Sequence, residues 1–452
     1  MSAWPDLVTA GLIGTGRAAV PVAAIPGLPA VEDVAHDPAL ALFDSARALL
    51  DHTALLTAAR RAGRRPGHAE PLPVCEPDPR PAVRPAARDR LARILGGAYP
   101  DLLAEWLTAA TFRGLRPPSE LLPALLDRAR RAWPADSVLP GLVAEAGGPR
   151  AAWLAALNPD WDFMPHEDLA AAEAWRLGDA GQRRGYLASL LPRDPEAARE
   201  LVMGSWGAAG PGERAMFLSV WAGRPASLAP ADEPLLEAAL DDRAEDVRGW
   251  AAYLLARLPG SALGQRMAER ARRCLRLEHG VGGARLVITL PAERDATMWR
   301  DGIRPGPVAG SHSPVHPPSL ADRMRLVSDV LARTPLRTWT DEFGLTAAQI
   351  AALPSGDWAP LLFSGWARAA IAQRHRDWMA VLLDRALTGR PGTAAEIEAL
   401  RQLARRADPA LGAPDALPGP GPDALPAIRD AIRVLRFRHD MLKELDDDHS
   451  AG

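Results

Sequence analysis

The sequence is poor in the residues that most often cross-link a fold or carry chemistry. Of its 452 residues, two are cysteine, three tyrosine and seven phenylalanine. Cys75 and Cys274 lie far apart in the chain, so the sequence predicts neither a disulfide framework nor a cysteine-based zinc site. Lys443 is the only lysine and Asn158 the only asparagine, so arginine carries almost all of the positive charge. A GC-rich coding bias accounts for this composition without a nucleic-acid function.

Long apolar runs and an excess of one charge are also missing. The net charge is −3 and the isoelectric point is near 6.4, which gives no overall attraction to phosphate. The sequence contains no run of eighteen apolar residues, and its first residues lack a basic stretch followed by an apolar core. We therefore expect a cytoplasmic protein that does not cross a membrane.

Helix-forming residues dominate the remaining composition. Alanine, leucine, arginine and glutamate are abundant, whereas isoleucine, threonine, tyrosine and phenylalanine are scarce, which favours helices over sheets. A chain of 452 residues also exceeds the size of one ordinary core, so it holds several domains or grows by adding repeats. The expected fold class is all-α.

Three helix pairs recur between residues 181 and 277. Their first helices share apolar residues at the spacing i, i+1, i+4, i+5, and each has an arginine two positions upstream: Arg184, Arg214 and Arg248. This spacing places one apolar stripe on each helix and an arginine near its start. A two-helix unit cannot bury both of its faces alone, so such units must stack. We therefore predict a HEAT-like α-solenoid with irregular flanking helices.

The third of these units, which begins at Asp241, resembles the HEAT repeat. In that repeat an aspartate before the helix and a Val-Arg pair on it support contacts between neighbouring repeats. Asp241 or Asp242, Val247 and Arg248 match those positions. The resemblance implies that the arginines pair with carboxylates of neighbouring repeats. A face of arginines that binds nucleic acid is the alternative reading.

Proline and glycine interrupt the helical pattern at several places. One interruption, at 280–318, combines a short strand near residue 286 with a long loop, and loops of this length usually have a function. The predicted segments are an N-terminal helical segment (1–65), a Pro-rich linker (66–87), HEAT-like repeats (88–279), a strand and loop insertion (280–318, its β/loop part at 284–318), C-terminal helical repeats (319–406), a Pro/Gly linker (407–425), a terminal helix (426–446) and a disordered tail (447–452).

No motif in the sequence predicts a catalytic or metal site. The glycine-rich stretch 11–17 matches neither a dinucleotide-binding pattern nor a P-loop, and no strand precedes it, so it reads as the exit from a first helix. His312 and His316 have the spacing of a helical metal pair, but the prolines around them exclude that helix. We expect no cofactor and no metal, and whether the protein is an enzyme stays open.

Tryptophan is the one abundant aromatic residue, with 14 copies. Seven of these tryptophans lie mostly beside apolar residues at helical spacing, which favours packing in a core over stacking on a ligand. They are Trp153, Trp161, Trp175, Trp250, Trp339, Trp366 and Trp378.

Several segments resemble an uncharacterised bacterial family of HEAT-like proteins, a domain of unknown function. The similar segments are WLAALNPDW at 153–161, RDGIR at 300–304, TPLRTWTDEFGL at 334–345 and the opening stretch 4–15. Members of that family tend to be encoded beside a SWIM zinc-finger protein, a MoxR-type AAA+ ATPase and von Willebrand A-domain proteins. The resemblance implies a scaffold or adaptor whose partner is an AAA+ ATPase or a von Willebrand A-domain protein.

The leading hypothesis is a non-enzymatic scaffold for protein–protein interaction, with the 280–318 insertion as a docking loop. A nucleic-acid-binding protein with an arginine-lined face and an enzyme with an unrecognised site are the alternatives, of which nucleic acid is the less expected partner. The candidate interaction residues are Arg184, Arg214, Arg248, Arg300, Asp301 and Arg304.

Overall fold

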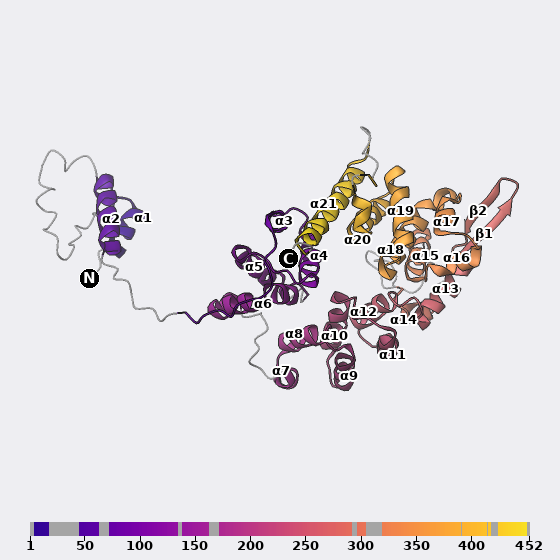
Figure 1. The fold of residues 1–452 in the computed structure, drawn as a ribbon, viewed down its shortest axis with the longest axis horizontal. Coiled ribbons are helices and arrows are strands. Elements are labelled where there is room, and N and C mark those ends of the chain that lie inside the picture. The colour runs from indigo at the N-terminus through magenta and orange to yellow at the C-terminus, as the bar shows by residue number, and fades with distance from the viewer. Residues whose placement is uncertain are drawn as a thin grey trace, which may run out of the picture. The chain divides into compact units, whose positions relative to one another are not determined.

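The structure, a computed structural model, is mostly helical and carries one two-stranded sheet (Figure 1). The chain divides into two units, Met1–Val74 and Cys75–Gly452. No helix within the described part of the chain is long and apolar enough to cross a membrane. The described residues are 4–17, 45–62, 72–133, 138–161, 171–291, 296–303, 319–389, 391–413, 415–416 and 424–449.

The described residues of the first unit form two helices that pack on each other, α1 (Trp4–Ile13) and α2 (Ser45–Ala62). Helix α1 ends where the N–H of Gly14 donates to the carbonyl of Ala10 at 3.0 Å. Gly14 has a φ of 93°, a conformation that glycine adopts without steric strain. The glycine-rich stretch 11–17 is therefore the end of a helix followed by a turn, as the sequence predicts.

Three helix pairs form the part of the second unit where the sequence shows its repeats. Helix α8 packs on α10 and α10 packs on α12, so the first helices of the pairs are neighbours. Local signals set their ends: Asp194 accepts from the N–H of Ala197 at the start of α9, and Ser261 caps α13 in the same way. The pairs are α8 (Ala180–Leu190) with α9 (Pro195–Ser205), α10 (Pro211–Gly223) with α11 (Glu233–Ala239), and α12 (Glu245–Leu255) with α13 (Ala262–Cys274).

Among the residues described ahead of these pairs, the second unit has five α-helices. Arg80 donates to the carbonyls of Glu145 and Ala146, both at 3.1 Å, at the kink where Gly148 (φ 53°) divides α6. The end of the segment predicted as linker is thus fixed to the body, and α3 starts at Pro85 because proline is well tolerated in the first turn of a helix. The helices are α3 (Pro85–Leu95), α4 (Leu103–Phe112), α5 (Leu122–Ala132), α6 (Val138–Leu157) and α7 (Ala171–Leu177).

The strand predicted near residue 286 is present and belongs to a hairpin. Strand β2 (Gly283–Ile288) pairs antiparallel with β1 (Leu275–Gly280), which follows α13 directly. The sequence analysis missed β1 because the apolar helical pattern of α13 leads straight into it. Short helix α14 (Ala296–Arg300) follows, and residues 292–295 and 304–318, which include His312 and His316, lie outside the described ranges.

Within the described residues, six further helices continue the second unit. Residues 359–388 form two of them, because Arg374 adopts a left-handed conformation (φ 52°) that ends α18. These helices are α15 (Leu320–Arg333), α16 (Arg337–Phe343), α17 (Ala347–Ala352), α18 (Ala359–Gln373), α19 (Arg376–Thr388) and α20 (Ala394–Arg406).

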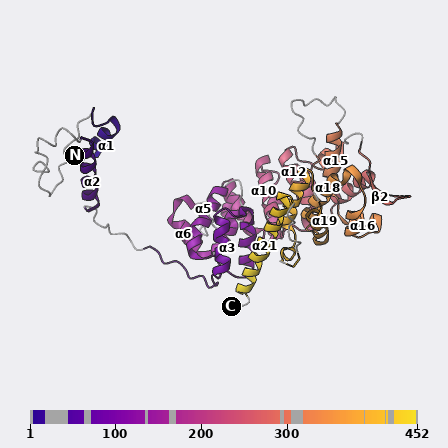
Figure 2. The same cartoon turned by 90° about the horizontal axis from the view of Figure 1, so that it is seen from above.

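The last helix, α21 (Pro426–His449), packs on α20 and also returns to α3 and α4 (Figures 1 and 2). Its first half contributes Ile432 and Leu435 to the larger hydrophobic core, and its second half contributes Met441 and Leu445 to the smaller one. Helix α21 therefore joins the two cores. It runs three residues into the segment predicted as a disordered tail, and residues 450–452 lie outside the described ranges.

Candidate functional site

Arginine–carboxylate pairs join successive helix pairs of the repeat region. In each pair the two partners lie about thirty positions apart in the sequence, which is close to the spacing of the repeats. We call these pairs the arginine ladder. They are Arg183–Glu213 (2.6 Å), Arg199–Asp232 (2.7 Å), Arg214–Asp242 (2.7 Å) and Arg266–Glu237 (3.1 Å).

The three arginines singled out by the sequence lie on α8, α10 and α12. Arg214 forms an ion pair with Asp242, with Nε 2.7 Å from one carboxylate oxygen, and its Nη2 donates to the other oxygen at 3.4 Å. Arg248 donates from Nη1 to the backbone carbonyls of Asp242 and Arg243, at 2.7 and 2.9 Å. Arg184 is half-buried on α8. Arg214 and Arg248 thus meet at the loop before α12, and their donors are used within the chain.

A second charged network fixes α14 to α11 and α13. Asp301, with 1% of its side chain exposed, accepts from Arg266 at 2.7 Å and also from Arg270. Arg300 reaches both carboxylate oxygens of Asp241, at 2.6 and 2.9 Å. Its hydrogen bonds hold the pKa of Asp241 below the usual range, and the carboxylate raises the pKa of Arg300. Because such bidentate pairs are geometrically specific, the orientation of α14 is well defined.

The two residues after Asp301 also help to hold α14 in place. Gly302 has a φ of 75°, and a Cβ at this position would lie 2.5 Å from the Cβ of Ala252. Ile303 is fully buried. The segment from Arg300 to Ile303 is therefore a structural clamp, whereas Arg304, the last of the predicted interaction residues, lies outside the described ranges.

The clamp lies within the range of this chain that matches a known protein family. The sequence profile of DUF5691, a family of unknown function, matches residues 6–411. The chain belongs to this family. The DUF5691 match ends before α21 begins. No curated protein and no solved structure matches the chain.

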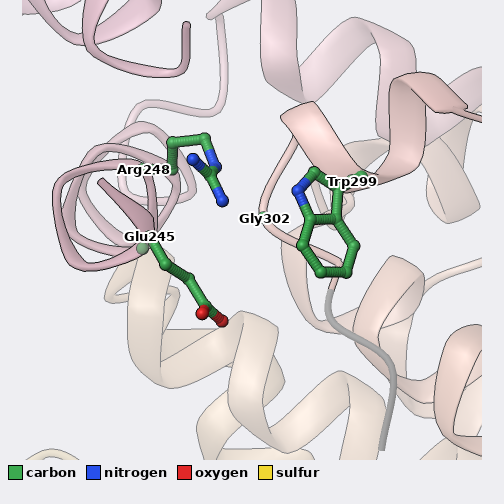
Figure 3. A pocket seen from close by; sticks show the side chains of 5 residues that line it. Glu245, Arg248, Trp299 and Gly302 are labelled. Carbon is green, nitrogen blue, oxygen red and sulfur yellow. The ribbon is translucent and has the colours of Figure 1, made fainter. Parts of the chain in front are cut away.

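One large aromatic side chain of this DUF5691 protein stays exposed beside the clamp. Trp299 on α14 is 45% exposed, and the guanidinium carbon of Arg248 lies 6.0 Å from the centroid of its ring. Figure 3 shows the two side chains facing each other above Glu245. The cavity between them measures about 10 Å³, enough for about one water molecule and no larger ligand.

A wider groove of about 380 Å³ lies among α4, α5 and the start of α6. Its charged lining residues are Asp101, Arg128 and Arg131, and Asp101 already pairs with Arg405 at 3.2 Å. The lining holds no nucleophile or general base beside this paired carboxylate. The groove therefore shows no catalytic arrangement. Across the described ranges of the DUF5691 chain, no group of three His, Cys, Asp or Glu residues is placed to hold a metal ion.

The tryptophans named from the sequence mostly belong to the hydrophobic cores. Trp161, Trp175, Trp339, Trp366 and Trp378 are buried, which confirms the predicted packing role for these five. The other two, Trp153 and Trp250, are half-buried.

Sequence reasoning named Asp242 but missed the other carboxylates of the arginine ladder, Glu213, Asp232 and Glu237, and the arginines of α13. A detectable signal exists for the ladder, because Glu213 and Asp242 follow Arg183 and Arg214 by 30 and 28 positions. Arg270 and Asp301 have a similar separation of 31 positions, but the β-hairpin lies between them, so no repeated helix pair marks this contact.

Proposed function

We propose that this chain is a non-enzymatic scaffold for protein–protein interaction, built as a HEAT-like α-solenoid. Support for the architecture comes from the arginine ladder, which repeats with the helix pairs and joins each pair to the next. In repeat proteins each unit is stabilised mainly by its neighbours, so regular contacts of this kind are expected between units.

The observation that carries the interaction role is the rigid presentation of Trp299. Helix α14 has five residues, too few to be stable in isolation. It is nevertheless held through Arg300 and the buried Asp301, while Trp299 remains 45% exposed. Exposed tryptophans held rigidly at a surface are frequent anchors of protein interfaces. We therefore place the docking surface at α14 and in the 280–318 insertion to which it belongs.

The partner we propose is another protein. The family resemblance favours an AAA+ ATPase or a von Willebrand A-domain protein, through the gene neighbourhood and not through any contact in this chain. The proposal is therefore tested by recovering the partner itself.

The test is co-purification of the full chain, with an affinity tag, from its native host cells. We expect a stoichiometric protein partner that is retained by Phe112→Ala and lost with Trp299→Ala. Phe112 is a matched control because it is an aromatic residue 87% exposed on α4. Deleting 305–317 should also release the partner, while leaving Arg300 and Asp301 in place to hold α14.

Two outcomes would count against this proposal. A partner that binds all three variants equally well removes α14 and the insertion from the interface. Recovery of no partner at all removes the scaffold function.

The nucleic-acid alternative has less support, because Arg214 and Arg248 donate to groups within the chain. Binding of DNA or RNA measured by fluorescence anisotropy, with the steep salt dependence of phosphate contacts, would restore it.

A further inference from the structure

The β-hairpin has one edge whose backbone groups point away from the rest of the sheet. At its base the N–H of Thr289 donates to the carbonyl of Cys274 at 2.8 Å, so these two residues form a hydrogen-bonded pair. Hydrogen-bonded and non-hydrogen-bonded pairs alternate along antiparallel strands, so the backbone groups of Leu275, Leu277 and His279 on β1 face away from β2. We call these three residues the open edge.

The described part of the chain leaves most of the open edge unused. The N–H of Leu275 donates back into α13. No described residue forms a hydrogen bond with the carbonyl of Leu275 or with the backbone groups of Leu277 and His279. The other edge of the hairpin differs, because the N–H of Leu286 donates to the carbonyl of Pro354 at 2.9 Å. Unpaired donors and acceptors on an edge strand form a template for another strand.

The hairpin is also accessible. It extends beyond α16 in two views of the molecule (Figures 1 and 2). Arg276, Glu278 and His279 on β1 are exposed, and Leu277 is half-buried. A two-stranded ribbon has little stability of its own in water, and further strands stabilise it. An additional strand can therefore reach the open edge and would strengthen the sheet.

From these observations we infer that β1 pairs with β1 of a second copy of this chain, antiparallel and centred on Leu277. The two hairpins then form one continuous sheet with the strand order β2–β1–β1–β2. The backbone groups of the two Leu277 residues bond to each other, and the N–H of each His279 donates to the carbonyl of the facing Leu275. The inference is independent of the scaffold function, because it involves none of the residues around Trp299.

The charges on one face of the hairpin fit this pairing. Arg276 lies opposite Glu278 of the other copy, and the symmetry of the dimer forms this pair twice. In the single chain Arg276 donates to the hydroxyl of Thr289 at 3.3 Å, and Glu278 pairs with Arg285 at 3.2 Å. In the dimer each Glu278 lies between two arginines, so the charges alternate across the sheet.

The charges also select the register. Open edges can face each other in the neighbouring registers, but these are centred on Arg276 or on Glu278 and place that residue opposite its own counterpart. Like charges directly opposite each other destabilise a sheet. The register centred on Leu277 avoids this repulsion. It also extends an apolar row on the other face, because Leu277 already lies opposite the buried Leu286.

The test is sedimentation equilibrium of the purified full chain across the micromolar range. We expect a monomer–dimer equilibrium that weakens roughly tenfold or more in Arg276→Glu, which creates a like-charge pair at each of the two symmetric positions. Adding Glu278→Arg to this variant should restore the dimer to within about threefold, because the charges are exchanged and the register is kept. Arg325→Glu is the matched control, because Arg325 is an exposed arginine on α15 and the change in net charge is the same.

A second variant tests the backbone hydrogen bonds. His279→Pro removes an N–H that points to solvent in the single chain, a position at which an edge strand tolerates proline. In the dimer the same N–H crosses the interface. We expect this variant to dimerise roughly tenfold more weakly or less still, because each copy loses a bond to the other. The thermal unfolding midpoint of each dilute variant shows that the monomer is folded.

Several results would overturn the inference. One is a chain that stays monomeric across the whole range. Another is a dimer that Arg276→Glu and His279→Pro retain at full strength, which would place the interface elsewhere. A dimer that the double charge exchange fails to restore would contradict the register. A monomer that captures a host protein, with capture lost in His279→Pro, would assign the open edge to a strand of that protein.

Discussion

The α14 network and the end of α12 both hold partly buried arginines, yet these arginines have different neighbours. At α14, Arg266 and Arg270 lie against the buried carboxylate of Asp301. Just after α12, Arg257 lies over the ring of Tyr253 and has no carboxylate partner among the described residues, and burial lowers the pKa of its guanidinium. Taking a charge out of water is unfavourable unless an opposite charge or strong hydrogen bonds compensate. The partner, and not the residue type, thus decides whether a partly buried arginine stabilises the fold.

The largest effect is expected from Asp301→Asn, which leaves Arg266 and Arg270 without their buried carboxylate. Removing one partner of a buried ion pair typically lowers the free energy of unfolding by about 3 kcal/mol or more. Urea unfolding followed by tryptophan fluorescence measures the loss. Asp241→Asn is the control, because Asp241 is 63% exposed and should change stability by less than about 1 kcal/mol. Equal effects of the two changes would contradict the structural role of Asp301.

The next largest effect on stability is expected from a direct comparison of two arginines. Arg438, 4% exposed, donates to Glu105 at 2.7 and 2.9 Å and to the carbonyls of Ala404 and Ala407. We expect Arg438→Met to destabilise the protein by about 2 kcal/mol, since it leaves these acceptors unpaired. Arg257→Met should be neutral or stabilising in the same urea experiment, because no carboxylate loses a partner. A comparable loss in both variants would remove the distinction between the two regions.

A smaller effect, of opposite sign, is expected from Arg374→Gly. Relief of the left-handed conformation is worth roughly 1–2 kcal/mol, and the added chain freedom of glycine offsets roughly 0.5–1 kcal/mol of this. The thermal midpoint should therefore rise slightly. Gly344→Ala, at the equivalent end of α16, should lower the midpoint. A falling midpoint in Arg374→Gly would show that the arginine serves stability.

The smallest effect concerns pH. Arg300 lowers the pKa of Asp241, so the unfolded chain takes up a proton at higher pH than the folded one does. The stabilising contribution is complete above the ordinary value of 3.8 and is lost as the pH falls through the lower folded pKa. The stability difference between the unchanged protein and Arg300→Met should therefore shrink below pH 3.8. A constant difference across the acid range, measured by urea unfolding, would contradict this.

Local patterns in the sequence predicted the helices well. The predicted C-terminal helical repeats (319–406) contain α15 and α20, because Ser319 and Thr393 cap these helices and apolar residues recur along each of them. Contacts between distant segments leave no such pattern. Nothing near α21 in the sequence indicates that it packs on α3 and α4, which lie more than three hundred residues earlier.

The candidate site residues also differ in whether a local sequence pattern predicted their contacts. The likeness to a HEAT repeat predicted that Arg248 serves contacts between repeats, but Arg248 donates to the carbonyls of Asp242 and Arg243 in its own repeat. Arg214 of the preceding pair makes the contact between repeats, with the carboxylate of Asp242. The sequence analysis did not single out Arg257, Arg374 or Arg406, because they lie at or just after the ends of three helices that are far apart in the chain.

The return of α21 to α4 has a consequence for the newly made chain. Arg438 and Glu105 are 333 residues apart, so at about 5–20 residues per second a ribosome needs roughly 15–70 s to travel from one to the other. During that interval the apolar surface of α3 and α4 that α21 later covers is open to water. We expect this surface of α3 and α4 to be the longest-lived binding site in this protein for chaperones that hold exposed apolar segments.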